Sequence, residues 1–273
     1  LNTVKDSLCG SVRLVVEPAE EIGKGGKWMV REGAMDGVDA VYGAHLWGEL
    51  DAPFVDVTGG LRMAGAETFK ITVEGVAAHG SAPHLGVDAI TAAAAIINNV
   101  QQYASRMNDP LNPLVVTIGT IRGGTRFNVI PNLVEMDGCV RTFQQDGHAE
   151  RSIRTIVEQT AAALGAKAEM DYEYLLKPVI NRDEQLLRIA RGAVVKLYGE
   201  EGIGHLNTLM GSEDFPHLCQ DIPYIFAFVG SRNEEKGFTY TNHHEKYTVD
   251  ESALKRGAAV MAQFAADYLA ENA

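Results

Sequence analysis

The spacing of apolar residues changes twice along the chain, near residues 65 and 176, and this change limits the possible folds more than any other feature. Between these points the spacing predicts six elements: a strand over 67–75, a helix over 86–107, strands over 113–124 and 132–143, a helix over 149–166 and a strand over 168–176. The order β-α-β-β-α-β is typical of a ferredoxin-like α+β domain.

The segments on either side of this region predict a different kind of domain. Apolar runs at 11–16 and 40–47 flank a helical pattern over 25–35, and this strand–helix–strand order implies neighbouring parallel strands. Three further elements are expected after Pro178: a helix near 183–198, a buried strand over 222–230 and a helix over 251–271. We therefore expect an α/β domain, built from 1–64 and 176–273, interrupted by an inserted ferredoxin-like lid over 65–175.

Composition excludes several classes of partner. The 273 residues carry 36 acidic and 24 basic side chains, for a formal net charge of −12, which argues against a nucleic acid or an anionic membrane as partner. No apolar run is long enough to span a bilayer. The three cysteines, odd in number and widely spaced, form no disulfide framework, so we expect a cytoplasmic protein.

Two adjacent carboxylates, Glu20 and Glu21, follow the expected strand at 11–16 in the sequence EPAEE. Sites in open α/β sheets lie beyond the carboxyl ends of strands, so one carboxylate could bind a metal while its neighbour activates water. The alternative is a solvated acidic turn. His45, in GAHLW, ends the expected neighbouring strand at the same edge, where it is either a core histidine or a ligand.

Further histidines lie in loops. His243 and His244 are adjacent in TYTNHHEKY and point apart, so at most one joins a given site, and a polar loop is the alternative. His79 and His84 flank GSAP, and a loop of such small residues buries little, which favours a functional role for its histidines.

Three polar sites complete the candidates. Arg141, in CVRTF, is a natural partner for a carboxylate, or else a surface residue of a strand, and Asn128 lies in FNVIP. The acidic stretch MGSEDF (210–215) is typical of helix capping. The chain has no dinucleotide fingerprint, phosphate-binding loop or nucleophile elbow.

Together these motifs resemble the co-catalytic metallopeptidase family of N-acyl-amino-acid amidohydrolases, which includes hippurate hydrolases and plant indole-acetyl-amino-acid hydrolases. The resemblance spans essentially the whole chain through EPAEE (17–21), GAHLW (43–47), HGSAPHLGVDAI (79–90), GGTRFNVIP (123–131), CVRTF (139–143), GSEDF (211–215) and NHHEKYTVDE (242–251). In this order and at these intervals the motifs are highly specific. The resemblance implies an exopeptidase-like α/β catalytic domain whose inserted lid carries a homodimer contact.

The resemblance also implies an activity and a division of roles. The reaction would be hydrolysis of the amide bond of a small N-acyl amino acid, assisted by two divalent ions, either Zn, Mn, Co or Ni. Glu20 would be the general base, Glu21 and His243 would bind one ion, and His45 would bind the other. His79 would stabilise the oxyanion. The substrate would be held by Asn128, Arg141 and His84.

The chain departs from the family pattern upstream of Glu17, which itself stands where glutamine is usual. The family's remaining ligands come from a His-x-Cys-Gly-His-Asp type of segment, and nothing here matches it; Cys9, in SLCGSV, has no neighbouring histidine. We therefore expect an N-terminal part to be missing, and this chain alone to be inactive for want of those ligands. Two alternatives stay open: a dipeptidase or carboxypeptidase of the same family, and a non-catalytic relative that keeps the fold and the dimer contact.

Overall fold

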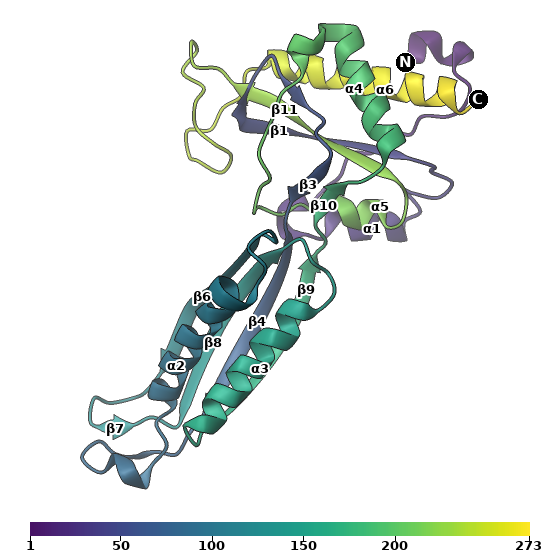
Figure 1. Cartoon of the computed structure of the whole chain (residues 1–273). Helices are drawn as coiled ribbons and strands as arrows, with labels where there is room; N and C mark the ends of the chain where they lie inside the picture. The colour runs from purple at the N-terminus through teal and green to yellow at the C-terminus, as the bar shows by residue number, and fades with distance from the viewer. The chain divides into compact units, whose positions relative to one another are not determined.

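The computed structural model describes all residues, 1–273, and the chain forms two compact units (Figure 1). The first unit combines Leu1–Arg62, Val179–Leu209 and Asp214–Ala273. The second combines Met63–Pro178 with the short stretch Met210–Glu213. The expected fold class, an α/β domain interrupted by an inserted α+β domain, is confirmed. The expected lid boundaries, 65 and 175, fall just inside the second unit.

The first unit is built on a three-stranded sheet with the order β1-β11-β2. Its strands are β1 (Val41–Asp51), β11 (Tyr224–Arg232) and β2 (Val55–Asp56). β1 and β11 run parallel, and β2 is antiparallel to β11. The central strand β11 is buried along nearly its whole length, as a strand covered on both faces should be.

Two helices, α4 (Glu184–Tyr198) and α6 (Ser252–Glu271), form the hydrophobic core of the first unit together with this sheet. Ile189 of α4 and Phe264 of α6 belong to the same buried cluster as Ile225 of β11. The remaining elements are η1 (Asn2–Ser7), η2 (Glu20–Ile22), α1 (Gly25–Arg31), β3 (Gly60–Met63), β10 (Val179–Asn181), η5 (Glu200–Gly202) and α5 (Phe215–Cys219).

The strand expected over 11–16 is absent, and this part of the sequence interpretation is wrong. Residues 11–19 belong to no helix or sheet, and Val12, Leu14 and Val16 are 45%, 78% and 78% exposed. An apolar run becomes a strand only where a neighbouring strand satisfies its backbone groups. The parallel partner of β1 is instead β11, which lies far along the chain.

The second unit has a four-stranded antiparallel sheet with the order β6-β8-β4-β9, covered by two helices. Its elements are β4 (Gly65–Glu74), β5 (Ala78–His79), η3 (Pro83–Leu85), α2 (Ala89–Gln102), the π-helical turn η4 (Tyr103–Met107), β6 (Leu114–Gly123), β7 (Val129–Ile130), β8 (Leu133–Thr142), α3 (His148–Ala163) and β9 (Lys167–Leu176). This is the expected β-α-β-β-α-β order, with short β5 and β7 added.

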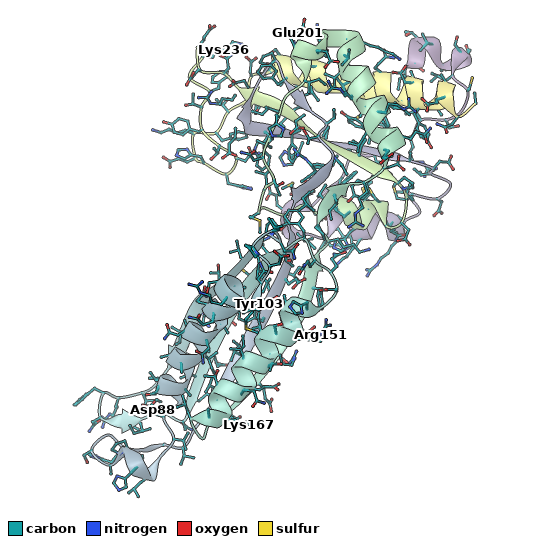
Figure 2. All side chains as sticks on the ribbon, in the orientation of Figure 1. Asp88, Tyr103, Arg151, Lys167, Glu201 and Lys236 are labelled. Carbon is teal, nitrogen blue, oxygen red and sulfur yellow. The ribbon has the colours of Figure 1, made fainter.

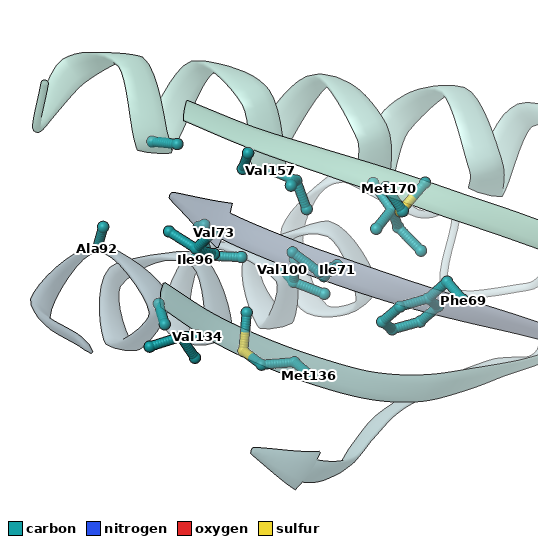
Figure 3. Close-up of a cluster of buried hydrophobic side chains, with 14 of the residues drawn as sticks. Phe69, Ile71, Val73, Ala92, Ile96, Val100, Val134, Met136, Val157 and Met170 are labelled. Carbon is teal, nitrogen blue, oxygen red and sulfur yellow. The ribbon is translucent and has the colours of Figure 1, made fainter. Parts of the chain in front are cut away.

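The core of the second unit lies between the sheet and the two helices. Figure 3 shows Ile96 of α2 and Val157 of α3 on the side chains of the sheet, among them Ile71 and Met136. α2 begins after Asp88, which is labelled in Figure 2. The Asp88 carboxylate accepts hydrogen bonds from the first-turn backbone N–H groups of the helix. None of the helices combines the length and the apolar composition that crossing a bilayer requires.

Candidate metal and amide-hydrolysis site

Glu20 and Glu21 lie on a tight turn rather than at the end of a strand. They begin the short 3₁₀ helix η2, which is bounded by Ala19 and Gly23, both in the left-handed conformation (φ 58° and 63°). A left-handed alanine is strained, and such strain gathers at functional sites. The turn places the Glu21 side chain in solvent, 76% exposed, while Glu20 is half-buried. The two carboxylates therefore have different surroundings.

Tertiary structure brings His243 to Glu21. His243 Nε2 lies 3.9 Å from Glu21 Oε2, and both side chains are 76% exposed. The backbone of His243 is left-handed, with φ 69°. His244 points elsewhere: its ring stacks on Tyr240 at 4.2 Å, and its Nδ1 accepts from the Lys246 N–H. The adjacent histidines thus diverge, and only His243 approaches a carboxylate of the turn.

His45 lies within β1, opposite Phe228 of β11, and not at a strand end as the sequence suggested. The strand continues to Asp51, although its regular parallel register with β11 stops at Trp47. His45 Nδ1 lies 2.6 Å from the carbonyl oxygen of Leu46, which can only accept, so Nδ1 carries the proton. The lone pair of Nε2 is then available to a metal, as in metal-bound histidines whose other nitrogen donates to a carbonyl.

These donors fit a divalent transition metal. A carboxylate and an imidazole face each other at Glu21 and His243, and the tautomer of His45 leaves one nitrogen free to coordinate. Nitrogen and oxygen ligands of this kind suit Zn, Mn, Co and Ni. No hydrogen bond joins His45 to the Glu21–His243 pair.

His79 and Asn128 lie together near one end of the second unit. His79 belongs to β5, which pairs with β7, and the N–H of Gly80 donates to the carbonyl oxygen of Asn128 at 2.8 Å. His79 Nδ1 accepts from the backbone N–H of Ser81 at 3.1 Å, so the ring proton is on Nε2. The exposed His79 ring therefore presents an N–H donor to solvent.

Arg141 lies far from His79 and Asn128 in the same unit. It is near the end of β8 and donates to the Ser212 hydroxyl at 2.5 Å. β7 precedes the other end of β8, at Leu133, and the strand between Leu133 and Arg141 covers about 26 Å at about 3.3 Å per residue. One chain therefore cannot bring both ends of this sheet to one small molecule. The remaining candidate, His84, is exposed on η3.

Two carboxyl groups that the sequence did not identify as candidates lie close together, next to the turn that carries Glu20 and Glu21. Carboxylate oxygens of Glu17 and Asp214 lie within 4.8 Å of each other. Burial, the charge and hydrogen bond of Asp214, and the charge of Glu20 raise the pKa of Glu17 to about 8. Both residues lie in motifs quoted above, but Glu17 looked like a small departure and Asp214 like a helix cap.

Comparisons with known proteins agree with the sequence motifs. The sequence profile described as peptidase family M20/M25/M40 matches residues 1–267. Thermostable carboxypeptidase 2 of Saccharolobus solfataricus is 35% identical over 96% of this chain and 67% of its own length. N-acetyl-L-cysteine deacetylase of Bacillus subtilis is 33% identical over 98% of this chain and 63% of its own.

Solved structures give the same result. The Bacillus subtilis YXEP protein, described as a dinuclear metal binding peptidase from the M20 family, superimposes with a TM-score of 0.83 and 31% identity. That match covers 98% of this chain and 68% of the YXEP chain. This chain thus spans about two thirds of the length of the proteins that it resembles.

Proposed function

The chain belongs to peptidase family M20/M25/M40, and on this premise we propose that the protein is a metal-dependent amidohydrolase acting on N-acyl amino acids. One observation carries the proposal: the fold brings Glu21 and His243, distant in sequence, within 3.9 Å of each other, beside Glu20. A solvated acidic turn gives no reason for a histidine from a distant loop to face it.

We assign the metal ligands as the resemblance implies, with Glu21 and His243 on one ion and His45 on the other. When bound, the two ions supply Lewis-acid polarisation of the amide carbonyl and lower the pKa of water. Glu20, which is less exposed than Glu21, would accept the proton of the attacking water and return it to the leaving amine. The adjacent carboxylates thus have separate tasks.

The second unit would bind the substrate. His79 would donate its Nε2 proton to the oxyanion of the tetrahedral intermediate, and the tautomer set by Ser81 supports that role. Arg141 would pair with the free carboxylate of the amino acid. Asn128 and His84 would complete the substrate contacts.

The separation of Arg141 from His79 and Asn128 supports a homodimer. Two-fold symmetry would let Arg141 of one chain and His79 of another serve one site. The edge strand β6 leaves Val115 and Ile121 39% and 51% exposed, as a strand that pairs with a second copy would.

The test of the activity is a substrate panel with the full-length protein, depleted of metal and reloaded with Zn, Mn, Co or Ni. We expect hydrolysis of hippurate or N-acetyl amino acids that a chelator abolishes. Faster cleavage of dipeptides would favour the peptidase alternative, which the name of the Saccharolobus relative also suggests. Absence of metal-dependent hydrolysis with every substrate would favour the non-catalytic alternative.

The test of the dimer uses two inactive variants, Glu20→Gln and His79→Ala, unfolded and refolded together. Random pairing makes half of the dimers mixed. If each site takes His79 from the other chain, each mixed dimer has one intact site. We then expect roughly a quarter of the wild-type activity. If the mixture stays inactive while each variant still forms dimers, His79 does not act across a dimer.

A further inference from the structure

The acid pair formed by Glu17 and Asp214 has no part in the chemistry described above. It lies next to the point where the two ends of the turn that carries Glu20 and Glu21 meet. Glu17 precedes this turn, residues 18–24, and α1 follows it at Gly25. The backbone returns so closely that a Cβ on Gly25 would lie 1.7 Å from the carbonyl oxygen of Pro18. Only glycine fits there, so the two ends of the turn are packed against each other.

The Glu17 side chain contributes to this packing. A Cβ on Gly26 would lie 2.8 Å from Glu17 Oε1 and 3.0 Å from the carbonyl oxygen of Asp214. The N–H of Gly26 donates to Asp214 Oδ2 at 3.2 Å, and Asp214 is fully buried. The start of α1 is thus held between the Glu17 carboxyl and α5, which begins after Asp214.

The hydrogen bonding of Glu17 requires a proton. Its Oε1 atom is buried, and no N–H or O–H group of the protein donates to it. The group that faces Glu17 is a second carboxyl, that of Asp214, and two ionised carboxylates are both acceptors only. A proton between them satisfies the buried oxygen, and without it two like charges would lie side by side.

The other titratable groups around Glu17 also favour the neutral acid. Glu20 of η2 adds a negative charge, and Glu213, next to Asp214 in the chain, is buried. Cys219 of α5 is a buried thiol whose pKa is raised chiefly by burial, so it stays neutral beside Glu17. The same burial and carboxylates raise the pKa of Glu17 to about 8.

We propose that Glu17 is a positioning residue: as a neutral acid it shares a proton with Asp214 and thereby fixes the turn that carries Glu20 and Glu21. The proposal rests on the proposed function only for the roles of Glu20 and Glu21. Loss of the proton above neutral pH sets two carboxylates against each other and loosens the turn. The positions of Glu20 and Glu21 therefore depend on pH.

Three variants of the full-length protein test this inference. Glu17→Gln keeps a hydrogen-bond donor and the shape of the neutral acid but cannot ionise. Glu17→Ala removes the side chain beyond Cβ. Glu32→Gln, at the exposed end of α1, is the control for the loss of one carboxylate. Each variant is measured at about pH 6 and about pH 9, on either side of the Glu17 pKa.

The first measurement is the free energy of unfolding against pH. The folded protein holds the Glu17 proton up to about pH 8, whereas the unfolded chain loses it near 4.5, so wild-type stability should fall as pH rises between those values. Glu17→Gln should lack this fall and exceed wild type at about pH 9, and Glu32→Gln should follow wild type. Equal pH dependence in wild type and Glu17→Gln would overturn proton sharing.

The second measurement is Zn²⁺ affinity, which needs no turnover and so separates this inference from the proposed function. Glu17→Ala should weaken binding by about 10- to 100-fold, and Glu17→Gln should restore it. Equal loss in both variants would overturn the neutral-acid role, and wild-type affinity in Glu17→Ala would overturn positioning. If Ca²⁺ or Mg²⁺ stabilises wild type but not Glu17→Gln at about pH 9, a cation rather than a proton joins the pair.

Discussion

Replacing Asp56 should destabilise the first unit more than replacing its ion-pair partner, Arg62. Both side chains are buried, 0% and 2% exposed, and Arg62 Nη2 lies 2.5 Å from Asp56 Oδ2. Asp56 also accepts from the backbone N–H groups of Thr58 and Leu206, each at 2.7 Å. Arg62, in contrast, has no acceptor for its buried Nε and otherwise contacts the ring of Phe228 at 5.2 Å.

The size of each effect follows from what the remaining partner keeps. Asp56→Asn removes the charge and leaves a buried guanidinium without an anion, which costs about 3–5 kcal/mol. Arg62→Met leaves an aspartate that still accepts two backbone hydrogen bonds, so we expect a loss of about 1–3 kcal/mol. The double variant Asp56→Leu with Arg62→Met buries no charge, and its stability should lie within about 1–2 kcal/mol of wild type.

Tryptophan fluorescence during urea unfolding reports on the stability of the first unit, which contains the Asp56–Arg62 pair. The chain has two tryptophans, and both Trp28 and Trp47 lie in the first unit. Trp47 packs edge-on against Phe228 at 5.3 Å, close to the ion pair. For a unit of this size the Asp56→Asn loss corresponds to a fall in melting temperature of about 6–20 °C.

The reasoning fails if the two single variants lose equal stability, or if the double variant loses as much as the sum of two single losses. Either result would mean that the pair is not an isolated buried ion pair. The outcome also concerns the site, because Phe228 stands opposite both Asp56 of β2 and His45 of β1. Asp56→Asn should therefore also weaken metal binding at His45.

Three further predictions address the chemistry of the site. Glu20→Gln should lower kcat by about 10²–10⁴-fold, because the water loses its base, whereas Glu32→Gln should retain normal turnover; steady-state kinetics decide. His243→Ala should weaken metal affinity by at least about 10–100-fold in a chelator competition, and His244→Ala, whose ring stacks on a tyrosine, should have little effect. His79→Ala should lower kcat by about 10²–10³-fold with metal content unchanged, and lost metal would show that His79 is structural.

The local periodicity of the sequence was sufficient for the second unit. Over much of their length β4 and β8 alternate buried residues with half-buried or exposed ones, and α3 buries one stripe from Ala149 to Ala161. Each of these elements finds its partners within the same continuous stretch of chain. The inserted domain could therefore be predicted from spacing alone.

Periodicity failed where a strand's partner is distant. The run at 11–16 has the composition of a strand, but no strand pairs with it, and β1 pairs with β11 instead. The short helix α5 begins directly after Asp214, as the helix-capping interpretation of MGSEDF would have it, but no helix was predicted over its residues. Hydrogen-bond partners of a parallel strand come from other parts of the chain, so a local pattern cannot identify them.

The sequence by itself determined which residue types are available for catalysis: the adjacent carboxylates, the histidines and the motifs that relate them to a family. Only the tertiary structure decided which of them meet. It turned His243 rather than His244 to Glu21, set the free nitrogen of His45, and placed Arg141 at the opposite end of the sheet from His79. It also brought Glu17 to Asp214, where burial and a second carboxyl raise the pKa of an ordinary glutamate. Proximity and burial set protonation, and neither can be read from the order of residues.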